Sequence, residues 1–93
     1  MTEIEELKSA VDINNYLNRL MPTIEKFLQY RPPGPPKDER KKLEGLLVLL
    51  TRLLDHAKKL AKEPGLLRDE KLRRKRVVRI IKNINWKLGK ILS

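Results

Sequence analysis

"LEGLLVLLTRLLDHAKKLA", residues Leu43 to Ala61, is the stretch that decides the fold. Its apolar residues recur with the period of an α-helix, and they cover a face wide enough to contact two neighbouring helices. That face consists of Leu43, Leu46, Leu47, Leu49, Leu50, Leu53, Leu54, Ala57, Leu60 and Ala61. Because Pro35 and Pro36 suit a first helical turn, the pattern predicts a central helix over about 36–62.

Two interruptions rich in Pro and Gly separate this helix from its neighbours. "RPPGPPK", residues 31–37, holds four Pro and one Gly, which favours a rigid linker over a polyproline ligand for an aromatic groove. "EPG", residues 63–65, predicts a turn. The flanking segments also have helical periodicity and show no strand-like alternation. The sequence therefore predicts an all-α fold, a three-helix bundle in a single domain over 1–93.

The first segment, about 3–29, changes its apolar phase along its length. One side carries Ile4, Leu7 and Val11. Nearly the opposite side carries a bundle-type seam of Ile13, Leu17, Leu20, Ile24 and Phe27 or Leu28. We therefore expect a short turn, a break near 9–12 with Ser9 and Asp12 in a capping box, and then the main helix. Pro22 lies inside that helix and is expected to bend it.

The third segment, about 66–92, combines an apolar stripe with an excess of positive charge. The stripe consists of Val77, Ile80, Ile81, Ile84, Leu88, Ile91 and Leu92. Extended towards the N-terminus, it brings Glu70, Arg73 and Arg74 onto the side that should be buried. Because unpaired buried charges cost several kcal/mol, we expect "RDEKLRRKR", residues 68–76, to project beyond the core or to meet something acidic. The third helix is thus predicted to be a protruding basic helix.

The net charge of +10 is concentrated in this third segment. Residues 1–30 contribute −2, residues 31–65 contribute +4 and residues 66–93 contribute +8. Such asymmetry indicates a polyanionic partner, either nucleic acid or an acidic protein surface, and the alternative is a solvated charged face. The candidate binding residues are Arg68, Lys71, Arg73, Arg74, Lys75, Arg76, Arg79, Lys82, Lys87 and Lys90.

Trp86, the lone tryptophan, is predicted on the outward side of the third helix, about 180° from the apolar stripe. Three explanations are open: stacking on a base, anchoring a protein partner, or packing against lysine stems. Single-stranded nucleic-acid sites present several aromatic residues, so the isolated Trp favours a protein contact. Leu72 precedes it by two steps of seven residues and is a second candidate anchor.

The sequence offers little for catalysis or metal binding. His56 has no second His and no Cys to accompany it, and the adjacent Asp55 points elsewhere on a helix. We expect no enzyme activity, no cofactor and no metal. The apolar run 46–50 is too short to span a bilayer, and the acidic start lacks the pattern of a signal peptide. We therefore expect a soluble, cytoplasmic protein. The high charge, the absence of Cys and the single Gln are typical of a thermophile.

In size, basicity, lack of Cys and helix content, the chain resembles the small accessory subunits of crenarchaeal family-B replicative DNA polymerases. Archaeal ribosome-associated helical proteins share this description. The resemblance covers the whole chain in general character, carries no motif and transfers no site residue; it implies a role in DNA replication.

The residues themselves favour a non-enzymatic accessory subunit or adaptor of a nucleic-acid machine. Such a subunit would contact a larger protein and the DNA or RNA phosphate backbone. The alternative is a stand-alone, sequence-nonspecific DNA- or RNA-binding protein. A peripheral binder of anionic membranes ranks third, because Trp86 is predicted opposite the apolar face that would meet lipid.

Overall fold

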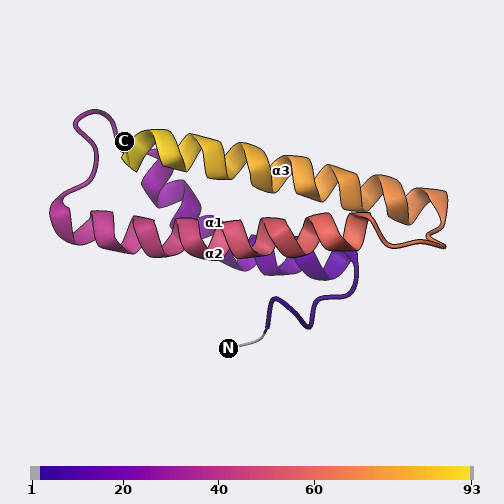
Figure 1. Ribbon diagram of the computed structural model, residues 1–93. Coiled ribbons are helices and arrows are strands. Elements are labelled where there is room, and N and C mark those ends of the chain that lie inside the picture. Colours follow the sequence, from indigo (N-terminus) through magenta and orange to yellow (C-terminus); the bar gives the residue numbers. More distant parts are fainter. Residues whose placement is uncertain (1–2, 93) are drawn as a thin grey trace.

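The computed structural model describes residues 3–92, and within them the chain forms three α-helices and no strand (Figure 1). The helices are α1 (Ala10–Leu28), α2 (Lys37–Ala61) and α3 (Arg68–Leu92). α2 and α3 run antiparallel beside each other along most of their length, and α1 lies across them (Figure 1). The prediction of an all-α three-helix bundle is confirmed.

A short turn precedes α1, as the phase change of the apolar residues predicts. In this turn the Glu6 N–H donates to the Glu3 carbonyl. Ser9 has an extended backbone, and its Oγ accepts a hydrogen bond of 3.2 Å from the Asp12 N–H. The predicted N-cap is therefore confirmed, and helical structure begins only at Ala10. In a capping box the Asp12 carboxylate would accept the N–H of Ser9. Here it accepts the N–H of the preceding residue, Lys8, at 3.0 Å.

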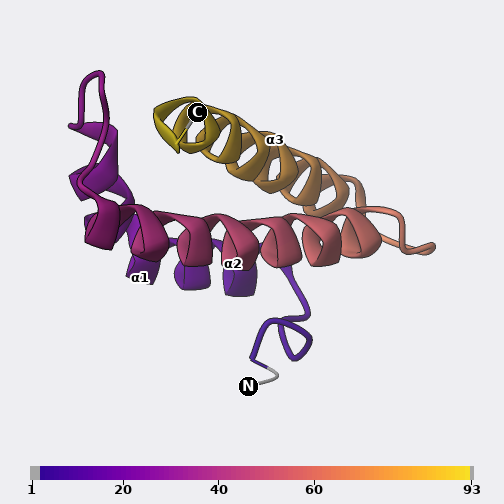
Figure 2. The ribbon, with the colours of Figure 1, turned by 60° about the vertical axis from the view of Figure 1, so that its left-hand side comes forward.

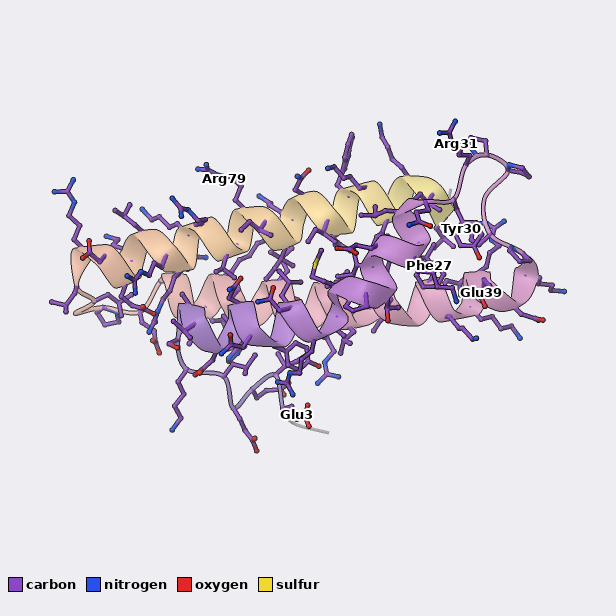
Figure 3. All side chains as sticks on the ribbon, turned by 180° about the vertical axis from the view of Figure 1, so that it is seen from behind. Glu3, Phe27, Tyr30, Arg31, Glu39 and Arg79 are labelled. Atoms are coloured by element: carbon purple, nitrogen blue, oxygen red, sulfur yellow. The ribbon has the colours of Figure 1, made fainter. Side chains whose placement is uncertain are left out.

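α1 changes direction part-way along its length (Figure 2). Pro22 lies inside the helix and has no N–H to donate to the preceding turn, which weakens the backbone ladder there. Beyond the bend, the end of α1 meets the start of α2, where Lys26 Nζ lies 3.3 Å from the Glu39 carboxylate. Figure 3 shows Phe27 and Tyr30 beside this junction. The bend thus brings the buried Phe27 into the core.

The linker after α1 crosses the C-terminal end of α3. Gly34 adopts a φ of +97°, and its N–H donates to the Arg31 carbonyl at 2.7 Å. A Cβ at this position would lie 3.0 Å from the Ile91 carbonyl oxygen, so both the backbone conformation and the close approach favour glycine. The Arg40 guanidinium donates to the Leu92 carbonyl at 2.7 Å. These contacts hold the end of α3 against the start of α2.

The core forms around the wide leucine face of α2. The buried residues of α2 are Leu43, Leu46, Leu50, Leu53, Leu54, Ala57 and Leu60. α1 contributes Ala10, Ile13, Leu17, Ile24 and Phe27, and α3 contributes Val77, Ile81 and Leu88. Ile80 departs from the predicted stripe, because 39% of its surface is exposed where α1 crosses α3. α3 also begins at Arg68, two residues later than predicted.

Arg74 is buried, with 6% of its surface exposed, and its guanidinium joins three elements. Its Nε–H donates to Glu70 at 2.6 Å, and its Nη1 donates to the Leu60 carbonyl at 2.7 Å and to Glu63 at 2.6 Å. Its Nη2 donates to the Lys8 carbonyl at 3.0 Å. We call this set of contacts the Arg74 cluster.

The Arg74 cluster decides between the two expectations for residues 68–76. The stretch does meet acidic groups, and they belong to the same chain. The expectation that it stands clear of the core is wrong at Arg74, whereas Arg68, Lys71, Leu72, Arg73, Lys75 and Arg76 are exposed. The assignment of Arg74 to a partner-binding site is also wrong, because its guanidinium is buried and already hydrogen-bonded. Glu70 extends the cluster by accepting the Ala10 N–H at 3.1 Å.

Replacing Arg74 by Met should lower the free energy of unfolding by about 3 kcal/mol, because a broken ion pair leaves its partners without a donor. Urea denaturation followed by circular dichroism measures this loss. Arg73→Met changes an exposed neighbour in the same way and should cost no more than about 0.5 kcal/mol. Equal losses in the two variants would show that the Arg74 cluster does not stabilise the fold.

Stability should also depend on pH through Glu70. Hydrogen bonds from Arg74 and from the Ala10 amide lower the pKa of Glu70 from its ordinary value of 4.5. The unfolded chain therefore binds the proton first as the pH falls, so the contribution of Glu70 is complete above about pH 4.5 and is lost below it. Urea denaturation between pH 7 and pH 3 measures the free energy of unfolding at each pH. In the Glu70→Gln variant, this free energy should fall less steeply below about pH 4.5 than in the parent protein. If the Glu70→Gln variant loses stability with falling pH as steeply as the parent protein, Glu70 is not the group responsible.

Candidate functional site

The outward side of α3 gathers nine exposed lysine and arginine side chains. Arg74 points inwards, and helical geometry directs the other nine cations of α3 away from α2. We call this set the basic face, and it consists of Arg68, Lys71, Arg73, Lys75, Arg76, Arg79, Lys82, Lys87 and Lys90. At a rise of about 1.5 Å per residue it extends for about 33 Å along the helix. The structure therefore presents nine of the ten predicted binding residues on one helix.

The positive charge of the basic face is largely uncompensated. After Glu70 the remainder of α3 contains no Asp or Glu. Within residues 3–92, Arg74 pairs with Glu63 and Glu70, whereas Arg76, Arg79 and Lys82 form no ion pair with a described residue. Arg73 interacts through space with the Glu70 carboxylate, and Lys90 lies against an aromatic ring. Such a surface attracts anions over several ångströms, and salt screens that attraction.

Trp86 lies on the basic face with 60% of its surface exposed, as predicted. The ammonium of Lys90 lies 3.9 Å from the centroid of the indole ring, a cation–π contact one helical turn further along. Leu72, four turns before Trp86, is 55% exposed. The two predicted protein anchors are therefore both accessible.

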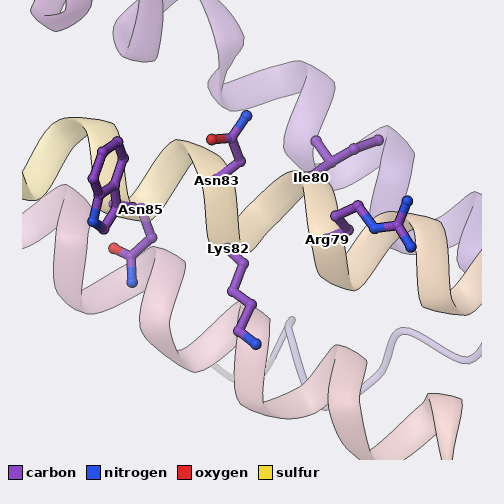
Figure 4. A pocket seen from close by; sticks show the side chains of 6 residues that line it. Arg79, Ile80, Lys82, Asn83 and Asn85 are labelled. Atoms are coloured by element: carbon purple, nitrogen blue, oxygen red, sulfur yellow. The ribbon is translucent and has the colours of Figure 1, made fainter.

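A shallow hollow lies on the surface of α3 near the middle of the helix. It is lined by Arg79, Ile80, Lys82, Asn83, Asn85 and Trp86. Figure 4 shows Lys82 and Asn85 on one side of the helix and Ile80 and Asn83 on the other. Cationic and amide groups on an open surface suit the oxygens of phosphates or carboxylates, which they contact as hydrogen-bond donors.

His56 has a partner within the chain. Its Nε2 lies 2.8 Å from the Leu7 carbonyl oxygen, which only accepts, so the ring nitrogen carries the proton and donates. The half-buried ring thus joins α2 to the turn before α1, while the neighbouring Asp55 is exposed. These contacts are structural, and they lie on a different helix from the basic face.

No helix within residues 3–92 is both long enough and apolar enough to cross a membrane. In comparisons with known proteins, no family model, curated protein or solved structure matches the chain. The functional argument accordingly rests on the residues of α3 and their surroundings.

Because Trp86 is the lone tryptophan and is exposed, we expect its fluorescence maximum to resemble that of tryptophan in water and to shift little on unfolding. Acrylamide should quench the native and urea-unfolded protein with similar efficiency. A strongly blue-shifted native emission that acrylamide quenches poorly would place Trp86 in an apolar environment and contradict its assignment to the basic face.

Proposed function

We propose that this protein is a non-enzymatic accessory subunit that binds the phosphate backbone of nucleic acid through the basic face of α3. One observation carries the proposal: nine exposed cations line a single helix that has no acidic residue after Glu70. A phosphate backbone is a regular array of negative charge, so it can neutralise cations spread along a helix.

The dimensions of the basic face favour a nucleic-acid duplex. Its length of about 33 Å is close to the rise of one turn of duplex DNA, about 34 Å. Arginine contributes Arg68, Arg73, Arg76 and Arg79, and its guanidinium binds phosphate oxygens in a bidentate fork. Phosphate contacts position a protein without reading sequence, so the expected binding is weakly sequence-specific.

Trp86 and Leu72 favour the accessory role over that of a stand-alone binding protein. An exposed Trp on a charged surface is typical of a residue that anchors a protein contact. In the accessory role a larger protein of the nucleic-acid complex covers Trp86. The resemblance in size, basicity and helix content suggests a replicative DNA polymerase as that complex.

Duplex binding should be steeply salt-dependent. Raising the salt concentration from about 50 to 200 mM should weaken binding to a short DNA duplex by about a thousandfold or more, if six or more phosphates are contacted. Fluorescence anisotropy measures the dissociation constant at each salt concentration. A change of less than about tenfold would show that the basic face is mainly solvated and would contradict the proposal.

A charge-matched pair of triple variants locates the contact. Lys75→Gln/Arg79→Gln/Lys82→Gln removes three cations from the basic face and should reduce the slope of log affinity against log salt by about 3. Lys37→Gln/Lys41→Gln/Lys59→Gln removes the same charge from exposed positions of α2 and should leave the slope nearly unchanged. Equal effects would indicate attraction by net charge alone.

The protein contact is tested separately by affinity purification from the native cell, with and without nuclease. Partners of an accessory subunit should survive nuclease treatment and be lost on Trp86→Ala, because that variant removes the anchor without changing charge. If nuclease removes every partner, the protein acts on nucleic acid alone.

A further inference from the structure

A second surface, a groove where α1 crosses α3, adjoins the basic face and shares Arg73 and Arg76 with it. Val11 and Asn14 line it from α1, and Arg73, Arg76, Val77 and Ile80 line it from α3. The groove is distinct from the outward side of α3 that carries Trp86, because residues of α1 form one of its walls. Ile80 lies between this groove and the shallow hollow of Figure 4.

The floor and walls of the groove are aliphatic and partly open. Val77 is buried at the base, whereas Val11 is 53% exposed and Ile80 is 39% exposed. The sequence pattern placed Ile80 in the core stripe, but in the structure Ile80 lies at the edge of the groove between α1 and α3. An apolar side chain inserted here would bury surface of both residues and would gain the free energy of removing that surface from water.

The groove is bordered by positive charge that belongs to α3. Arg73 and Arg76 are both exposed, and neither forms an ion pair or side-chain hydrogen bond with another described residue. Glu70 interacts with Arg73 only through space, since its carboxylate is held by Arg74 and the Ala10 amide. Asp69 lines an adjoining hollow with the same two arginines. An occupant with further carboxylates would therefore find complementary charge.

We propose that the groove binds an acidic segment of another protein, with one aliphatic or aromatic side chain between Val11 and Ile80 and flanking carboxylates on Arg73 and Arg76. Nucleic acid is the poorer occupant, because its phosphates suit the arginines but it has no aliphatic side chain for the floor. The proposal goes beyond phosphate binding: with duplex on the other seven cations of the basic face and an acidic segment on Arg73 and Arg76, the protein joins the two.

A peptide series tests this proposal. The peptides have the form Glu-Asp-Glu-X-Asp-Glu-Asp, with X changed from Ser to Ala, Val, Leu and Phe at constant charge. Titration into 15N-labelled protein, followed by amide chemical shifts, measures even weak binding. We expect the Leu and Phe peptides to bind at least about tenfold more tightly than the Ser peptide, since the larger side chain buries apolar surface. The amides of Val11 and Ile80 should shift most. Equal affinity across the series, or no binding, would overturn the proposal.

A neutral pair of variants separates the groove from the basic face. Val11→Ser should abolish the preference for Leu over Ser at X, whereas Val48→Ser, at a 63% exposed position of α2, should keep it. Both variants alter exposed side chains, and circular dichroism confirms their folding. Neither changes charge, so both should bind duplex as the parent protein does. If Val11→Ser retains the full preference, the apolar side chain binds elsewhere and the proposal fails, whatever the outcome of the duplex experiment.

Discussion

A single buried guanidinium, that of Arg74, connects three parts of the chain that are distant in sequence. It donates to the Lys8 carbonyl before α1, to the Leu60 carbonyl and Glu63 at the end of α2, and to Glu70 within α3. Four of its five N–H groups are satisfied in this way. A carbonyl at a helix C-terminus favours a positive charge, so the end of α2 is stabilised directly. In a small domain with a modest core, this polar cluster complements the leucines of α2.

Arg74 is buried on the same side of α3 as Val77, Ile81 and Leu88, and together they leave the opposite side of the helix facing the solvent. With Arg74 and Val77 turned towards α2, helical geometry directs Arg79 and Trp86 away from it. Positive charge on α3 is thus divided between one arginine that holds the fold and nine cations that remain accessible. The same orientation leaves Ile80 at the edge, where α1 passes and forms the second wall of the groove. Fold and candidate sites therefore depend on one rotational setting of α3.

Local patterns in the sequence predict much of this arrangement. Leucine periodicity predicts α2, Ser9 predicts the start of α1, and the angular position of Trp86 predicts its exposure; the structure confirms each. The partners of Arg74 include Glu63, 11 residues before it, and the Lys8 carbonyl, 66 residues before it, and these contacts depend on how the helices dock. The exposure of Ile80 depends on the path of α1 over α3. No periodicity within a single helix encodes such docking, so the sequence marked Arg74 as anomalous without identifying its partners.

Protection of lysines from acetylation on duplex binding tests the central claim, that the outward side of α3 is the binding surface. The protein is acetylated with and without saturating duplex, and mass spectrometry measures the rate at each lysine. The account predicts slower acetylation of Lys75, Lys82 and Lys87 on the basic face, with unchanged rates at Lys41 and Lys59 on α2. Uniform protection of all five lysines, or protection confined to α2, would contradict it.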